Sequence, residues 1–97
     1  MNNDKKVVFF DTVYAGFRDE SEGRFNRIGP SELAKFMDKT VRVKIEEIGN
    51  SKLKIVFTDH ISPDNLWETT GKFDAGGAVN LGKFIGKEVK VTITEVD

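Results

Sequence analysis

Apolar and polar positions alternate most clearly in two stretches of the chain, residues 41–46 and 89–94. In each stretch a valine or isoleucine occupies every second position, and the positions between them are charged or carry threonine. Successive side chains of a strand point to opposite faces of a sheet, so this period of two predicts two strands that are each buried on one face.

Shorter apolar runs, residues 7–10 and 55–57, precede these stretches, and an aspartate follows each run or lies one residue beyond it. They are rich in β-branched and aromatic residues, which predicts strands with both faces covered, as in a closed barrel. We expect loops of about eleven residues after them, over 12–22 and 60–70. Short strands are predicted next, at Gly23–Ile28 and Gly71–Ala75.

A helical period follows each short strand. Apolar residues at spacing i, i+3 and i+4 predict a short helix with one buried stripe. Pro30 suits the first turn of the first helix, and Gly86 is placed to end the second. The stripe residues are Leu33, Phe36 and Met37 in the first helix and Leu81, Phe84 and Ile85 in the second.

The whole series of elements occurs twice with a shift of 48 positions. Over residues 6–48, 16 of 43 positions are identical to their counterparts, where unrelated segments share roughly two or three. We therefore predict two ββαβ repeats, 6–48 and 54–96, with a joint at 49–53. A chain of 97 residues has material for one core, so residues 1–97 should form a single domain: mainly β, with two short helices and a six-stranded closed barrel about a pseudo-twofold axis.

Each repeat carries a Gly-basic-aromatic strand, Gly23-Arg24-Phe25 or Gly71-Lys72-Phe73, followed by a short helix and a Val-x-Val strand. This pattern resembles the cradle-loop barrels, which include RIFT barrels, double-psi barrels and the AbrB-type swapped-hairpin transcription factors. The resemblance implies a RIFT-like or double-psi barrel and, for the AbrB type, contact with DNA through arginines on comparable strands. Family members usually place Gly-Asp before the final strand, whereas this chain has Asp38-Lys39 and Gly86-Lys87 there.

Composition excludes several classes of protein. Fifteen Lys and Arg stand against sixteen Asp and Glu, a net charge of −1, so any contact with a polyanion requires a local basic patch. The chain has no cysteine, which excludes disulfides and thiolate metal sites and fits a reducing compartment. No apolar run reaches the roughly twenty residues of a membrane span, and the first residues do not form a signal peptide. We expect a cytoplasmic monomer without cofactor or metal.

Basic residues give the strongest functional indication, because five positions are basic in both repeats. If Arg24 and Arg42 lie on neighbouring strands, with Lys72 and Lys90 across the axis, a basic surface could follow the phosphates of DNA or RNA. The alternative is an ordinary solvated barrel exterior. The matching pairs are Lys6 with Lys54, Arg24 with Lys72, Lys35 with Lys83, Lys39 with Lys87, and Arg42 with Lys90. The predicted nucleic-acid-binding residues are Arg24, Arg27, Arg42, Lys72 and Lys90.

Two other functions remain open. Phe17 and Trp67 lie in the predicted loops, where aromatic side chains can anchor a protein partner or cover the end of a barrel. Asp11 and Asp59 occupy equivalent positions and could form a carboxylate dyad, although aspartates at such places usually bind backbone amides. His60 is the only histidine. These three residues are the candidate site for an enzyme comparable to the riboflavin kinases, which share the RIFT metafold. The prediction is a non-enzymatic binding module.

Overall fold

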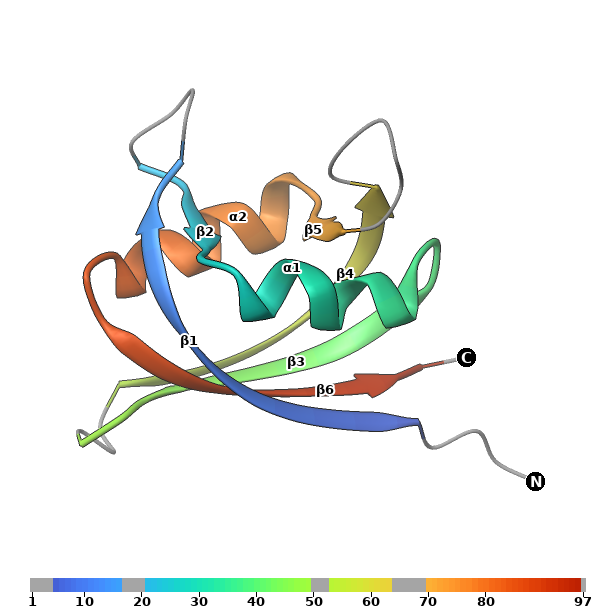
Figure 1. Ribbon diagram of the computed structural model, residues 1–97, viewed down its shortest axis with the longest axis horizontal. Helices are drawn as coiled ribbons and strands as arrows, with labels where there is room; N and C mark the ends of the chain where they lie inside the picture. Colours follow the sequence, from blue (N-terminus) through green and yellow to red (C-terminus); the bar gives the residue numbers. More distant parts are fainter. Residues whose placement is uncertain (1–4, 17–20, 50–52, 64–69, 97) are drawn as a thin grey trace.

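The two halves of the chain form the same series of elements (Figure 1). The computed structural model describes residues 5–16, 21–49, 53–63 and 70–96. The first half contains β1 (Lys6–Ala15), β2 (Gly23–Phe25), α1 (Ile28–Leu33), the 3₁₀ turn η1 (Ala34–Phe36) and β3 (Thr40–Glu47). The second contains β4 (Lys54–Pro63), β5 (Gly71–Phe73), α2 (Ala75–Leu81), η2 (Gly82–Phe84) and β6 (Glu88–Glu95). The fold is mainly β with two short helices, as predicted.

All strand pairs are antiparallel, and the strand order is β2-β1-β6-β3-β4-β5. At the centre of this order β3 pairs with β6, and Lys44 lies opposite Thr92. The sheet curls until its two end strands approach each other, so that the rings of Phe25 and Phe73 lie 5.7 Å apart. No ladder joins β2 to β5 within the described ranges. The barrel is therefore nearly closed, where the sequence predicted full closure.

The alternating stretches supply the core, as predicted, together with two of the three residues in each helical stripe. Val41, Val43 and Ile45 of β3 and Val89, Val91 and Ile93 of β6 are completely buried, and Leu33, Phe36, Leu81 and Phe84 pack against them, whereas Met37 and Ile85 are only partly buried. Both helices cover one face of the curled sheet (Figure 1). Each begins earlier than expected, at Ile28 and Ala75.

The prediction that the first strand of each half is covered on both faces is wrong. Val8, Phe10 and Val56 are 47%, 54% and 58% exposed, whereas Phe9 between the first two is buried. β-Branched and aromatic residues favour a pleated backbone whether or not their side chains are buried. Both strands also continue beyond the apolar run, to Ala15 and Pro63, so the predicted loops begin several residues later.

Each helix ends against the edge strand of the other half. A Cβ added to Gly23 would lie 2.7 Å from the backbone carbonyl of Leu81 at the end of α2. Gly71 approaches Leu33 and Ala34 at the end of α1 in the same way. This close approach of backbones requires glycine at position 23, and at Gly71, where an added Cβ would lie 3.0 Å from Leu33, it favours glycine. Among the described helices none is long and apolar enough to span a membrane.

Candidate functional site

Basic residues cluster on the outward side of the four long strands. Side chains that alternate with the buried ones point to this side, and strand register brings twelve of them into three rows, with Thr12 and the exposed Glu88 in a further pair next to Phe10 and Lys90. The rows, read across β1, β6, β3 and β4, are Lys6, Thr94, Arg42, Thr58; Val8, Thr92, Lys44, Val56; and Phe10, Lys90, Glu46, Lys54. We call these twelve residues the basic face.

The basic face carries five cationic side chains and one carboxylate on a protein of net charge −1. Lys44 lies 4.0 Å from Glu46, while Lys6, Arg42, Lys54 and Lys90 are exposed. Cross-strand neighbours have Cβ atoms about 5 Å apart, which places Lys90 beside the exposed ring of Phe10. The arrangement offers cations around exposed aromatic and aliphatic side chains.

Other matching basic pairs have structural partners. Lys39 Nζ lies 3.4 Å from Glu95 Oε2, and Lys87 Nζ lies 3.4 Å from Glu47 Oε2. Both ion pairs join one half of the chain to the other, and both carboxylates are largely buried, with 10% and 17% of the Glu95 and Glu47 side chains exposed. Lys35 on η1 pairs with Glu32 on α1 at 2.8 Å. The repetition of Lys39 and Lys87 therefore does not require a ligand.

Strand order separates the predicted nucleic-acid-binding residues into two groups. β1 and β6 lie between β2 and β3, so the expectation that Arg24 and Arg42 occupy neighbouring strands is wrong. Arg42 and Lys90 belong to the basic face. The other three residues, Arg24, Arg27 and Lys72, lie together at a separate groove.

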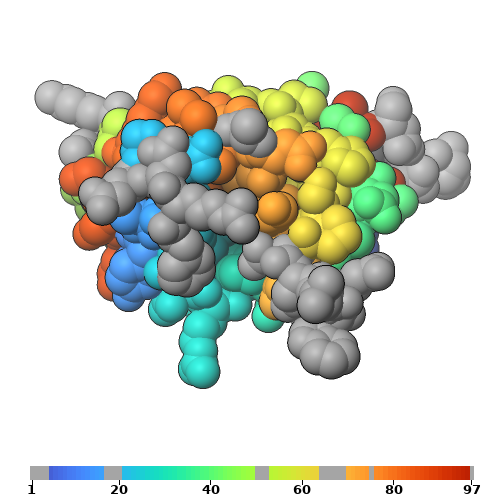
Figure 2. Space-filling model, turned by 90° about the horizontal axis from the view of Figure 1, so that it is seen from above, coloured from blue at the N-terminus to red at the C-terminus, as the bar shows by residue number. Residues whose placement is uncertain are grey.

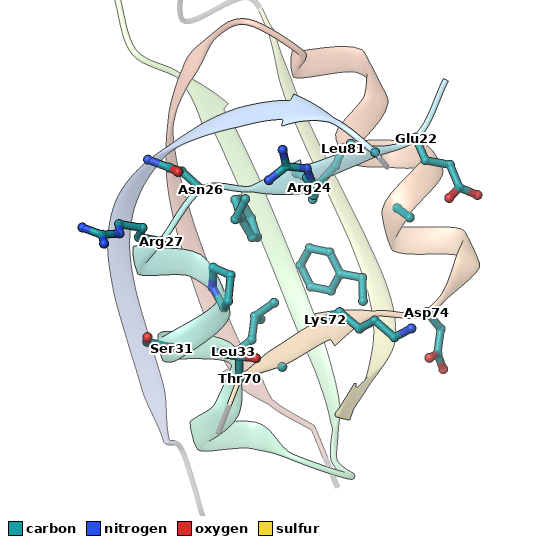
Figure 3. Close-up of a pocket in the computed structure, with 17 residues that line it drawn as sticks. Glu22, Arg24, Asn26, Arg27, Ser31, Leu33, Thr70, Lys72, Asp74 and Leu81 are labelled. Carbon is teal, nitrogen blue, oxygen red and sulfur yellow. The ribbon is translucent and has the colours of Figure 1, made fainter. Parts of the chain in front are cut away.

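This groove, of about 780 Å³, opens where β2, β5 and both helices meet (Figure 3), on the side of the molecule that faces the viewer in Figure 2. Its apolar lining consists of Phe25, Pro30, Leu33, Phe73, Ala78 and Leu81. Polar side chains surround this lining. Arg24 donates from Nε to the Ala15 carbonyl at 3.0 Å, and its guanidinium lies 5.6 Å from the centre of the Tyr14 ring. Arg27 and Lys72 are exposed.

Asp11 and Asp59 hold the helices to the sheet. Asp11 accepts hydrogen bonds from the backbone N–H of Thr12 at 2.8 Å and of Gly29 at 2.6 Å. Asp59 accepts from His60 at 2.8 Å and from Gly77 at 2.7 Å. Each carboxylate therefore binds backbone amides, as aspartates at such positions usually do, and two strands separate β1 from β4 in the sheet.

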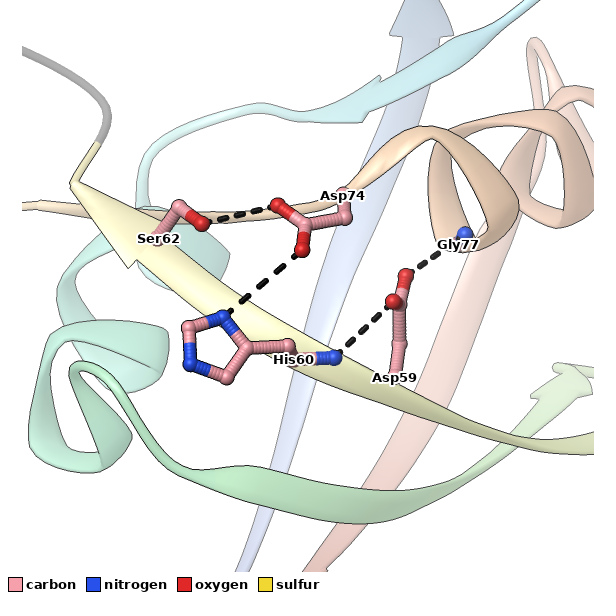
Figure 4. Close-up of polar contacts among 5 residues, drawn as sticks. All are labelled: Asp59, His60, Ser62, Asp74 and Gly77. Atoms are coloured by element: carbon pink, nitrogen blue, oxygen red, sulfur yellow. Dashed lines mark hydrogen bonds and ion pairs between the residues drawn. The ribbon is translucent and has the colours of Figure 1, made fainter.

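Asp74 is a polar partner of His60 that the sequence analysis did not identify (Figure 4). His60 Nδ1 lies 3.6 Å from Asp74 Oδ2, and the Ser62 hydroxyl donates to Asp74 Oδ1 at 2.7 Å. In a nucleophilic site the serine hydroxyl bonds the histidine, whereas here it bonds the aspartate. The pairing of β4 with β5 brings these residues together, a relation that sequence spacing alone does not reveal.

Among the residues that the structure describes, no group of three His, Asp or Glu side chains could hold a metal ion. Phe17 and Trp67, the predicted loop anchors, lie outside the described residues. Comparison with known proteins adds no further candidate, because no family model, curated protein or solved structure matches the chain.

Proposed function

We propose that this protein is a non-enzymatic binding module whose basic face binds single-stranded nucleic acid. The observation that carries the proposal is the set of three cross-strand rows, which surround exposed Phe10, Val8 and Val56 with cations. Single strands bind where basic groups follow the phosphates and aromatic rings stack on bases. The geometry favours single strands over duplex because both helices lie on the opposite side of the sheet and are six and seven residues long.

Arg42 and Lys90 keep the role predicted from sequence, joined by Lys6, Lys44 and Lys54 as contacts for phosphates. Phe10 is the stacking residue. We leave Arg24, Arg27 and Lys72 out of this surface because they line the groove.

The barrel itself is, in this proposal, a pseudo-twofold structure of two ββαβ repeats of the cradle-loop kind. Equal strand lengths in the two halves support it, as does the register: Val43 pairs with Ile93 and Ile45 with Val91, which are interchanged by the shift of 48. The AbrB-type resemblance rests on the Gly-basic-aromatic strands, whose glycines meet the opposite helix.

Binding of a fluorescent oligothymidylate, followed by anisotropy as salt is raised, tests the function. We expect binding at low salt that weakens with a slope of about −0.7 per phosphate contact in a plot of log K against log salt. Arg42→Gln and Lys90→Gln should each make that slope shallower by about 0.7. Lys35→Gln is the matched control, since Lys35 lies on η1 and pairs with Glu32.

Phe10→Ala should weaken binding of the oligonucleotide roughly tenfold, because loss of a stacked base costs about 1–3 kcal/mol. The exposed position of Phe10 leaves the folded state intact, which thermal unfolding of the variant would verify. Absence of binding at low salt, or equal binding by wild type and Phe10→Ala, would refute the proposal.

A further inference from the structure

We infer that the groove between β2 and β5 is a second, separate site, which binds an extended acidic peptide as an added strand. The inference does not depend on the proposed function, because the basic face and the groove share no residue. It rests on three properties of the groove: the direction of the backbone groups in its two edge strands, its apolar lining and the charges around it.

The backbone of β2 directs alternate residues into the groove. Asn26 N–H donates to Thr12 and Gly16 N–H donates to Glu22, so the even-numbered residues of this strand bond β1. In an antiparallel ladder the intervening residues direct their N–H and C=O to the opposite side. Gly23 and Phe25, both of them buried residues, therefore direct their backbone groups away from β1, toward the groove that both residues line.

The same rule applies to β5. Ile61 N–H donates to Lys39, on the side of β4 away from β5, so the pair of Ile61 with Phe73 is not hydrogen-bonded. Phe73 and Gly71 thus direct their backbone groups away from β4, into the groove that both residues line. Two strand edges border the groove, and an extended peptide between them could bond both, as peptides do when they extend a sheet.

The side chains around the groove define which peptide sequence fits it. Inward-pointing residues of such a peptide would meet the apolar lining, where Leu33 and Leu81 flank the paired rings of Phe25 and Phe73. Outward-pointing residues would meet Lys72, which is exposed at the rim, whereas the side chain of Arg27 is exposed but points away from the groove (Figure 3). Two carboxylates, Glu22 and Asp74, also line the groove beside the basic residues Arg24, Arg27 and Lys72, and Asp74 already bonds Ser62 and approaches His60. The favoured ligand alternates apolar and acidic residues.

A titration of the ¹⁵N-labelled full-length protein with a synthetic peptide that alternates valine and glutamate tests this site. We expect the amide resonances of Gly23, Phe25, Gly71 and Phe73 to shift, with a dissociation constant of about 1 mM or tighter. The same peptide N-methylated at alternate residues keeps its side chains and loses the N–H donors that face one of the two strand edges, so it should bind at least about tenfold more weakly.

Variants separate this site from the basic face. Lys72→Glu should weaken binding of the valine-glutamate peptide severalfold, whereas Lys90→Glu should leave it unchanged. The inference is overturned if about 1 mM peptide produces no shift, if N-methylation has no effect, or if both variants weaken binding equally. It is also overturned if oligothymidylate shifts these four amides, because the groove would then not be a separate site. Protection of these amides from hydrogen exchange in the free protein would overturn it as well, because the strand edges would then already be occupied.

Discussion

At the scale of single residues, the two aspartates that begin as candidates for catalysis are anchors of the helices. Each carboxylate joins its own strand to the start of a helix through two backbone N–H groups. Hydrogen bonds to a charged group are worth about 1.5–3 kcal/mol each, and a buried group left unpaired is costly. The presence of this aspartate in both halves is therefore explained by its contribution to the stability of the fold.

Asp11→Asn should lower the free energy of unfolding by about 2 kcal/mol, because the new amide places an NH₂ where two N–H donors converge. Asp59→Asn should cost less, since Asp59 is more exposed than Asp11, which is 8% exposed. Urea unfolding followed by circular dichroism measures both. Unchanged stability in both variants would contradict the anchoring role and return the aspartates to the list of catalytic candidates.

Backbone conformation supplies a second prediction at this scale. Gly86 has φ of 85°, where a side chain is strained, and Asp38 occupies the equivalent place with φ of 63°. Gly86→Ala should destabilise the protein by about 1 kcal/mol.

Gly76→Ala is the matched control for Gly86→Ala. Added Cβ atoms meet nothing within 4 Å at either position, but Gly76 lies in α2, where alanine is the better helix former by up to about 1 kcal/mol. We expect Gly86→Ala to lower the urea midpoint and Gly76→Ala to raise it. Changes of the same sign would contradict the view that the left-handed backbone conformation at position 86 requires glycine.

At the scale of elements, the ion pairs of β3 and β6 join the halves. Glu47 accepts from Lys87 through Oε2, while its Oε1 is buried with no hydrogen-bond partner among the described residues. Removing the lysine would leave a carboxylate that is 17% exposed without its cation. The loss should exceed that of an exposed pair, for which about 0–1 kcal/mol is typical.

Lys87→Met should therefore destabilise the protein by up to about 1 kcal/mol more than Lys35→Met, which removes the cation from Glu32, a carboxylate whose side chain is more exposed, at 25%. Chemical denaturation of the two variants gives the comparison. In the Lys87→Met background, Glu47→Gln should restore part of the loss by removing the buried charge. Equal effects of the two lysine substitutions would show that burial of Glu47 has no influence.

Elements also show how far sequence analysis reaches. The strands with strict alternation and the helical stripes are predictable because burial decides the residue type at each position, as Val43 and Phe36 illustrate. The exposure of one face of β1 is not, because Val8 and Phe10 have strand-forming side chains that remain exposed. Strand order depends on contacts distant in sequence, so neither the separation of Arg24 from Arg42 nor the approach of Asp74 to His60 follows from spacing.

At the scale of the whole molecule, the central pairing of β3 with β6 predicts the behaviour of an isolated half. Residues 50–97 lack both partners of β6, the strands β1 and β3, and should be unfolded or form a symmetric dimer. In such a dimer Thr92 would lie opposite its own copy, since Thr92 lies opposite its equivalent, Lys44, in the full chain.

Sedimentation equilibrium and circular dichroism of this fragment decide the outcome. A folded monomer would contradict the interlocked barrel. If the fragment dimerises, Thr92→Cys should allow a disulfide between the two copies, because facing residues of antiparallel strands have Cα atoms about 4.5–5.5 Å apart.

The basic face also differs between positions that the proposed axis makes equivalent. Phe10 lies beside Lys90, whereas the corresponding neighbour of Arg42 is Thr58. A ring for stacking is thus present near one end of the face and absent at the other. A nucleic-acid strand has distinct 5′ and 3′ ends, and a symmetric surface would accept it in either direction. The replacement of one aromatic ring by threonine gives this surface a polarity, so that a bound strand would run one way across it.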